Sequence, residues 1–273
     1  MSELVYVVAK DSVLQLSQKQ TMNADECPLI CFKASMDKRI LCATEDLSAL
    51  LTIEFFGEVV SPPKCPPYTE VKAVQKGGRN AAWFVEHPLF SGVVRQYRRG
   101  GLIGKFIRSH YIWQGEEQTR SWEEFKVLHY LYAKGVPVAK PIAAVYQRHG
   151  WWYQAALITE KIPNTMTLVQ AIQHIGEQNR ESLDGLAKEV AKVVMTMHQH
   201  RVNHVDLNAF NILIDMAASK VYLIDFDKAR LEQQLGSWCQ DNLNRLRRHL
   251  LKTLGEQGGD FAQLINKHYH CTE

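Results

Sequence analysis

Several features of exported and membrane proteins are missing from this sequence of 273 residues. No apolar run approaches the ~18 residues that a membrane-spanning helix needs, and the first ten residues lack the basic start and long apolar core of a signal peptide. We therefore expect the protein to stay in the cytoplasm. The six cysteines include no Cys-x-x-Cys pair, so we expect free thiols rather than a zinc site or a disulfide framework: Cys27, Cys31, Cys42, Cys65, Cys239 and Cys271.

The sequence also lacks internal repeats, low-complexity tails and a strong charge of either sign. It has 32 basic and 29 acidic residues, a formal net charge of +3, and it is 46% hydrophobic and 22% charged. These values exclude intrinsic disorder, collagen-like repeats and a coiled coil. A chain of this length can bury a large core without disulfide or metal staples, as one large domain or as two joined lobes.

Apolar patterning changes along the chain from strand-like to helix-like. Residues 1–60 read as a loosely patterned lead-in, and four prolines within residues 62–67 mark a stiff linker or the edge of a lobe. Thr167 and Gln170 have the spacing of a helix capping box. We predict an α+β fold of two lobes, with residues 1–160 forming a β-rich N-terminal lobe and residues 161–273 forming a helical C-terminal lobe.

Individual elements follow from the spacing of apolar residues and from the glycines and prolines between them. Short strands are expected at residues 71–74, 82–85, 92–94, 151–159, 212–214 and 221–224. Helices are expected at residues 121–134, at 183–199, and from residue 241 onward with a glycine-rich break at 255–259.

The strongest chemical signal is the run His204-Val205-Asp206-Leu207-Asn208-Ala209-Phe210-Asn211, between a predicted helix and a predicted strand. This H-x-D-L-x-x-x-N spacing is typical of the catalytic loop of the kinase fold. Such a loop presents a carboxylate to the acceptor hydroxyl and, five residues later, an amide oxygen to a metal on the ATP phosphates. Asp206 and Asn211 hold those positions here.

A second motif, Asp225-Phe226-Asp227, follows an apolar strand fourteen residues after Asn211. A strand that ends on an aspartate delivers a carboxylate oxygen, which is the kind of ligand that Mg²⁺ prefers. Taken alone, either motif also fits an ordinary turn. Their order and separation together favour a kinase site with Asp206 as the catalytic residue and Asn211 and Asp225 as metal ligands.

The first half of the chain supplies candidates for holding the nucleotide. Gly77 and Gly78 fit a glycine loop whose backbone N–H groups approach the phosphates, although a plain hairpin turn fits them nearly as well. Arg95, at the end of a predicted strand, holds the position of the usual phosphate-binding lysine. Glu124, on the predicted helix 121–134, is the expected partner of Arg95, because the neighbouring Glu123 points about 100° away around the helix.

These segments together resemble the lipopolysaccharide kinase family. The resemblance covers roughly residue 71 to the C-terminus and rests on the two motifs, on residues 94–106 before them and on residues 241–248 after them. Its most specific piece is Arg95-Gln96-Tyr97-Arg98-Arg99-Gly100-Gly101-Leu102, which general protein kinases do not share. The family's catalytic aspartate falls on Asp206, and the metal positions of the kinase fold fall on Asn211 and Asp225.

The resemblance implies a two-lobed, protein-kinase-like fold and an enzyme that uses ATP and Mg²⁺. Its substrate would be Kdo-lipid A, phosphorylated on the 3-deoxy-D-manno-octulosonic acid (Kdo) sugar during assembly of the lipopolysaccharide inner core. Such an enzyme would be peripheral, on the cytoplasmic face of the bacterial inner membrane. No nucleic acid and no obligate protein partner are expected.

The sequence departs from the protein-kinase pattern in four places. Arg95 and Asn208 stand where many protein kinases have lysine, Asp227 replaces the glycine of D-F-G, and no A-P-E segment follows. The last two changes remove the glycine hinge and the segment that docks peptide substrates. The departures therefore argue against a protein as the substrate.

Two other readings stay open at this stage. One is a catalytically silent kinase-fold module that binds a membrane or a partner, although such a module has no need to keep Asp206, Asn211 and Asp225 together. The other is a small-molecule phosphotransferase of the aminoglycoside or choline type, which would share the catalytic loop.

A basic window separates this last reading from a lipid-directed enzyme. Residues 87–115 contain no acidic residue and five cations: Arg95, Arg98, Arg99, Lys105 and Arg108. Aromatic residues lie between them, so we expect residues 95–113 to contact an anionic membrane surface, with a solvated or packed loop as the alternative. A second basic run is interpreted as a solvated helix face: Arg245, Arg247, Arg248 and Lys252.

Overall fold

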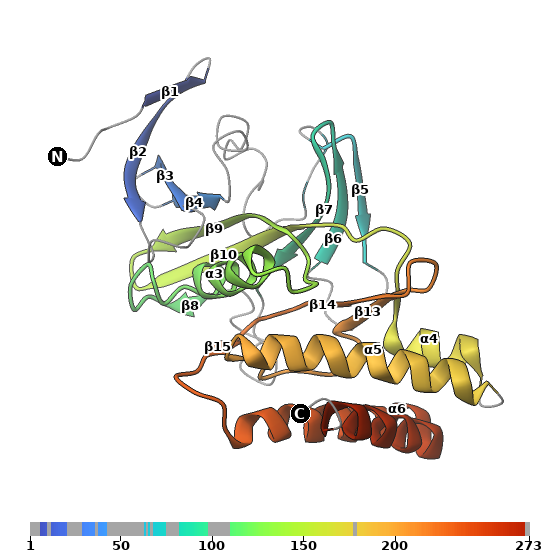
Figure 1. Cartoon of the computed structure of the whole chain (residues 1–273). Coiled ribbons are helices and arrows are strands. Elements are labelled where there is room, and N and C mark those ends of the chain that lie inside the picture. Colours follow the sequence, from blue (N-terminus) through green and yellow to red (C-terminus); the bar gives the residue numbers. More distant parts are fainter. Residues whose placement is uncertain are drawn as a thin grey trace. The chain divides into compact units, whose positions relative to one another are not determined.

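The structure of the chain is a computed structural model. It describes residues 6–9, 12–20, 29–35, 38–42, 63, 65, 68–74, 82–97, 110–176 and 179–270. The chain divides into two compact units (Figure 1). Unit 1 comprises Met1–His129 and Lys140–Lys161, and unit 2 comprises Tyr130–Ala139 and Ile162–Glu273. Unit 1 is rich in strands and unit 2 is mainly helical, so the predicted α+β class is confirmed.

Unit 1 is built on one antiparallel sheet, to which the described residues contribute ten strands. Their order across the sheet is β1 (Tyr6–Ala9), β2 (Ser12–Gln20), β3 (Leu29–Ser35), β4 (Lys38–Cys42), β9 (Pro141–His149), β10 (Trp152–Glu160), β7 (Phe90–Gln96), β6 (Ala82–His87) and β5 (Glu70–Ala73). A short strand, β8 (Tyr111–Ile112), also pairs with β10. The strands predicted at 71–74, 82–85, 92–94 and 151–159 are confirmed as β5, β6, β7 and β10.

Helix α3 (Arg120–Ala133) confirms the helix predicted at residues 121–134. Its apolar residues at helical spacing, Trp122, Phe125 and Leu128, are all buried. The Trp122 ring lies 5.0 Å from the ring of Tyr146 on β9, so the part of α3 that belongs to unit 1, up to His129, packs on the sheet of that unit. Glu124 lies on the same buried face of α3.

Unit 2 contains two long helices and several short strands. In chain order these are β11 (Met166–Thr167), α4 (Leu168–Ile175), α5 (Arg180–Gln199), β12 (Val202–Asn203), β13 (Ile212–Asp215), β14 (Lys220–Leu223), β15 (Arg230–Leu231) and α6 (Ser237–His270). Strands β11, β13 and β14 form one small sheet, and β12 pairs with β15. Figure 1 shows α5 and α6 side by side.

The local signals read from the sequence in unit 2 are confirmed. Thr167 caps α4 in a capping box with Gln170, in which each side chain bonds the other's backbone N–H. Helix α6 is broken at Gly255, whose φ of 62° and ψ of −139° are not helical. A Cβ at Gly258 would lie 2.2 Å from the Leu250 carbonyl oxygen, so only glycine fits where the two arms of α6 approach each other.

The lead-in at residues 1–60 contributes more structure than its patterning indicated. Four strands, β1 to β4, lie in it and extend the sheet beyond β9. Strand β9 was not predicted either, because its run of apolar residues from Pro141 to Tyr146 is buried on both faces and shows no alternation. Among the described residues no helix is long and apolar enough to cross a membrane, and Cys42, Cys65 and Cys239 are free thiols.

Candidate active site

The predicted catalytic loop connects β12 to β13 in unit 2. Two backbone hydrogen bonds fold it into consecutive turns, from Leu207 N to His204 O and from Asn211 N to Asn208 O, both 3.0 Å long. The side chain of Asn208 ties the loop further, since its Nδ2 donates to Asp206 O (2.9 Å) and its Oδ1 accepts from Phe210 N (2.9 Å). Asn208 is therefore a structural part of the loop.

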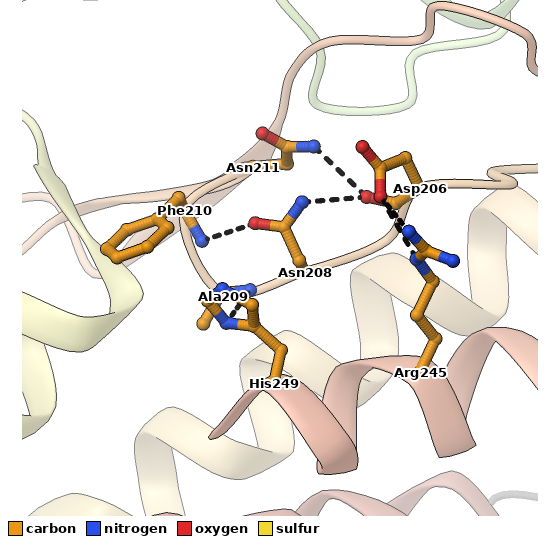
Figure 2. Close-up of polar contacts among 7 residues, drawn as sticks. All are labelled: Asp206, Asn208, Ala209, Phe210, Asn211, Arg245 and His249. Carbon is orange, nitrogen blue, oxygen red and sulfur yellow. Dashed lines mark hydrogen bonds and ion pairs between the residues drawn. The ribbon is translucent and has the colours of Figure 1, made fainter. Parts of the chain in front are cut away.

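The predicted metal ligands are Asn211, directly before β13, and Asp225, shortly after its partner strand β14. Asn211 is nearly buried, and its Nδ2 donates to the carbonyl oxygen of Asp206 (3.1 Å), so the side-chain amide is held by the loop (Figure 2). Its backbone oxygen accepts from Ile224 N (3.0 Å). Because Asp225 is the residue after Ile224, this hydrogen bond brings Asn211 and Asp225 to the same end of the β13–β14 pair.

Asp225 has a left-handed backbone with a φ of 62°. A non-glycine residue in this region carries conformational strain, which folded proteins keep mainly where the conformation serves a function. The next residue, Phe226, is fully buried, and its ring lies 4.6 Å from the ring of His204. The buried Phe226 therefore anchors the chain directly after Asp225.

The side chain of His204 connects the predicted catalytic loop to the Asp225 motif. Its ring is fully buried, and its Nε2 lies 3.1 Å from the carbonyl oxygen of Ile224, so Nε2 carries the proton that it donates. Nδ1 accepts no hydrogen bond from the described residues. Burial lowers the pKa of His204, which favours the neutral ring with its one proton on Nε2 and none on Nδ1.

Helix α6 supports the loop through Asn242. The Oδ1 of Asn242 accepts from His204 N (3.1 Å) and from the Nε2 of His198 (3.3 Å), and its Nδ2 donates to the side chain of Asn203 (2.9 Å). The other ring nitrogen of His198 accepts from the hydroxyl of Tyr269 (2.8 Å), near the end of α6. Burial lowers the pKa of His198 to about 4, so this network contains a neutral imidazole.

Asp206 itself is half-exposed and is bound by a residue that sequence reasoning missed. Arg245, on α6, donates from Nε (3.0 Å) and from Nη2 to the same carboxylate oxygen, Oδ1 (Figure 2). One turn further along α6, the Nδ1 of His249 accepts from Ala209 N (3.4 Å).

The prediction that the second basic run lies exposed on a helix face is confirmed for all four residues, and Arg245 in addition binds Asp206, which the prediction did not include. Residues 242, 245 and 249 share one face of the helix, and that face supports the catalytic loop. Their spacing in the sequence indicates a shared helix face but not what that face contacts.

In unit 1, Arg95 and Glu124 come together. Arg95 Nη2 forms an ion pair with Glu124 Oε2, which also accepts from the hydroxyl of Tyr97 (2.6 Å). The side chain of Glu124 is 1% exposed and that of Arg95 is 22% exposed, whereas Glu123 is exposed on the outer face of α3. Burial, together with the charge of Glu124, raises the pKa of Tyr97 well above its usual range, so the hydroxyl keeps the proton that it donates.

Other predicted residues lie outside the described part of the chain. These are Gly77 and Gly78, together with four cations of the basic window: Arg98, Arg99, Lys105 and Arg108. At the end of the window, Tyr111 is buried and the Trp113 ring packs 5.1 Å from the ring of Tyr146. Ile112 between them is exposed.

The residues in unit 2 suit a hard divalent cation. The Oδ1 of Asn211 accepts no hydrogen bond from the described residues, because the amide is fixed through Nδ2. Among the described residues, no group of three or more His, Cys, Asp or Glu side chains forms a metal cluster. One amide and one carboxylate oxygen match Mg²⁺, which is commonly held by one or two protein ligands together with substrate phosphates.

Comparison with known proteins places the chain in a family. The family model "Lipopolysaccharide kinase (Kdo/WaaP) family" matches residues 68–268. A protein of Vibrio cholerae named 3-deoxy-D-manno-octulosonic acid kinase is 43% identical over 66% of this chain and 74% of its own length. A protein of the same name from Xylella fastidiosa is 38% identical over 69% of this chain and 73% of its own length.

A solved structure described as WaaP in complex with acyl carrier protein also matches. It has a TM-score of 0.47 and 15% identity, over 72% of this chain and 79% of that one. The family model spans the predicted catalytic loop, the Asp225 motif, the Arg95–Glu124 pair and the arm of α6 that contacts the loop. With these segments inside one match that covers most of the sequence, the chain belongs to the lipopolysaccharide kinase (Kdo/WaaP) family.

Proposed function

We propose that this protein is a Kdo kinase, which transfers the γ-phosphate of ATP to a hydroxyl of the Kdo sugar on Kdo-lipid A. The observation that carries the proposal is the folded 204–211 loop, which holds Asp206 and Asn211 beside Asp225. The curated relatives at 38% and 43% identity, both named 3-deoxy-D-manno-octulosonic acid kinase, support this acceptor. The reaction belongs to assembly of the lipopolysaccharide inner core.

Asp206 receives the acceptor hydroxyl in this proposal. Its Oδ1 is occupied by Arg245, and its Oδ2 accepts no hydrogen bond from the described residues, so Oδ2 is the atom that orients the hydroxyl and takes its proton. Catalysis then consists mainly of positioning the hydroxyl and of stabilising charge on the transferred group. The two turns of the loop and the Asn211 side chain fix the Asp206 backbone for this task.

Asn211 and Asp225 would hold Mg²⁺, through the amide and carboxylate oxygens described above. The ion supplies neutralisation of the ATP phosphate charge. The strained backbone of Asp225 supports this role, since its left-handed conformation turns the carboxylate out of the strand direction at the end of β14.

The nucleotide phosphates would be bound by residues of unit 1. Arg95 is the proposed phosphate cation, with Glu124 and the Tyr97 ring, 4.7 Å from its guanidinium carbon, fixing its orientation. Gly77 and Gly78 would add backbone N–H groups around the phosphates. An arginine with one partly exposed face can reach a phosphate and keep its ion pair at the same time.

The protein would act as a peripheral enzyme on the cytoplasmic face of the inner membrane. The support is the basic window, where five cations occur between residues 87 and 115 without an acidic residue. Arg95 is engaged by Glu124 and Tyr111 is buried, so the contact with the anionic lipid surface would fall to Arg98, Arg99, Lys105 and Arg108.

The proposal is tested by giving the purified protein Mg²⁺ and ATP labelled on the γ-phosphate, with separate acceptors: Kdo-lipid A, aminoalcohols and a peptide mixture. We expect label in Kdo-lipid A, and none when Mg²⁺ is removed by chelation. Label only in the aminoalcohols would favour a small-molecule phosphotransferase. A folded protein that labels no acceptor, while still binding anionic vesicles, would favour a silent membrane-binding module.

A further inference from the structure

The contact between Arg245 and Asp206 places a cation beside the proposed catalytic carboxylate. Asn208, which stands where many protein kinases have lysine, is neutral and is used up in the turns of its own loop. The cation comes instead from α6, a separate element 39 residues further along the chain. The helix holds the backbone of Arg245 beside the loop, and the half-exposed guanidinium reaches Asp206 from there.

Arg245 is one of a row of cations on this arm of α6. Arg248 and Lys252 follow at positions i+3 and i+7, so all three lie along one face, and both are exposed. No acidic residue occurs from residue 242 to residue 255. A positive potential of this kind next to a site raises the local concentration of an anionic substrate.

Arg247 differs from this row. It lines a cavity of about 370 Å³ between the two arms of α6, together with Leu243 and Ile265. It belongs to the same helix and carries the same charge, but none of the described hydrogen bonds joins it to the catalytic loop. Arg247 is therefore a matched control for any effect that depends on the face of the helix rather than on its charge.

The ion pair of Arg245 with Asp206 is exchangeable. The side chains are 47% and 51% exposed, and both donors bind the single oxygen Oδ1, so water competes with the pair and its contribution to stability is small. The planar guanidinium is suited to a carboxylate that it can bind through two parallel hydrogen bonds. A substrate carboxylate can thus engage Arg245 at little cost.

We infer that Arg245 binds the carboxylate of the acceptor sugar and so selects a hydroxy acid. The inference rests on the proposed function, in which the acceptor is the sugar acid Kdo. Oδ2 of Asp206 takes the hydroxyl and the neighbouring guanidinium takes the carboxylate, so the two groups of one sugar meet two adjacent groups of the protein. Arg245 is a specificity residue in this scheme, and Arg248 and Lys252 contribute the surrounding positive potential.

The test compares two acceptors, Kdo-lipid A and its analogue with the Kdo carboxylate converted to the carboxamide. Wild-type protein is expected to have a KM about tenfold lower for the acid, since a charge-assisted pair is worth about 1.4 kcal/mol or more. Arg245→Gln should raise the KM for the acid about tenfold, leave kcat within about threefold and leave the KM for the amide unchanged. Arg245→Lys should fall between these, and Arg247→Gln should match wild type.

Three outcomes decide the matter. A KM of Arg245→Gln that is raised for the acid but not for the amide supports the inference. A fall in kcat that is equal for the two acceptors would overturn it, because Arg245 would then act on Asp206 or on the transferred phosphoryl group. Wild-type protein that phosphorylates neither acceptor would remove the proposed function as well. Thermal unfolding of each variant checks that the exposed substitution leaves the fold intact.

Discussion

In unit 2, the residues of the candidate site are close in sequence and mostly bonded to one another's backbone, whereas in unit 1 Arg95 and Glu124 are 29 positions apart and meet through side chains alone. The two regions also differ in their exposure to water. Asp206 is 51% exposed, while Glu124 is 1% exposed. In the proposed function, the acceptor hydroxyl needs access to Asp206, and the buried Glu124 orients Arg95, the proposed phosphate cation.

This difference explains how each part responds to substitution. Asp206 can lose its carboxylate charge without leaving a buried group unpaired, so activity should change and folding should not. Glu124 is a buried carboxylate that depends on Arg95 and Tyr97, so a change there affects stability and nucleotide binding together. Experiments that separate turnover from stability therefore distinguish the two regions.

Apart from the substitution of Asp206, the largest effect on activity is expected at Asp225. Asp225→Asn removes a charged oxygen ligand while keeping its shape. Groups that only hydrogen-bond to metal ligands already contribute ten- to a hundredfold to metal affinity, so we expect about a hundredfold lower rate at limiting Mg²⁺. Raising Mg²⁺ should recover part of the rate. An unchanged Mg²⁺ titration would place the metal on other residues.

The second prediction concerns His198, the buried histidine that Asn242 links to the predicted catalytic loop. The pKa of His198 is lowered to about 4 by burial, against about 6.5 in the unfolded chain. The unfolded state therefore binds more protons between these values. The contribution of neutral His198 to the free energy of unfolding is therefore complete above about pH 6.5. It declines as the pH falls, by about 2 kcal/mol between pH 7 and pH 5. His204, whose pKa burial also lowers, acts in the same direction.

Urea unfolding at a series of pH values measures this slope. His198→Gln should be less stable at pH 7, because it loses the bond to Tyr269, but it should have a flatter dependence on pH. His174→Gln, at an exposed position on α4, should behave as wild type. Parallel slopes in wild type and His198→Gln would show that folding does not lower the pKa of His198, contrary to the burial described above.

The smallest of these effects is expected in unit 1, at Arg95. Arg95→Met should raise the KM for ATP about tenfold, the value of one charge-assisted hydrogen bond. It should also cost about 1–2 kcal/mol of stability, since Glu124 stays buried while Arg95 was partly exposed. Adding Glu124→Gln should restore stability but not the KM. Lys72→Met, which removes an exposed cation on β5, is the control. If the double variant regained the wild-type KM for ATP together with its stability, the Arg95–Glu124 pair would be purely structural.

The same contrast between regions decides how much could be predicted from the sequence. Asp206, Asn211 and Asp225 carry a fixed spacing, because the turns between them are closed by nearby backbone groups. Glu124 was separable from Glu123 because helix geometry gives them different faces. Arg245 was missed because its partner lies 39 residues away, and only the folding of α6 against the loop brings them together. The four strands before residue 60 were missed because their apolar patterning is loose. Strands β1 to β4 pair with their neighbours in the sequence, and only the pairing of β4 with β9 spans about a hundred residues.

The central claim, that the loop at 204–211 performs the chemistry, is tested most directly by Asp206→Asn in the Kdo-lipid A phosphorylation assay at saturating ATP and acceptor. The substitution is nearly isosteric and half-exposed, so the fold and the nucleotide affinity should stay as in wild type. We predict a kcat lower by at least about a hundredfold, in line with the contribution of a positioned general base. A kcat within a few-fold of wild type would contradict the account.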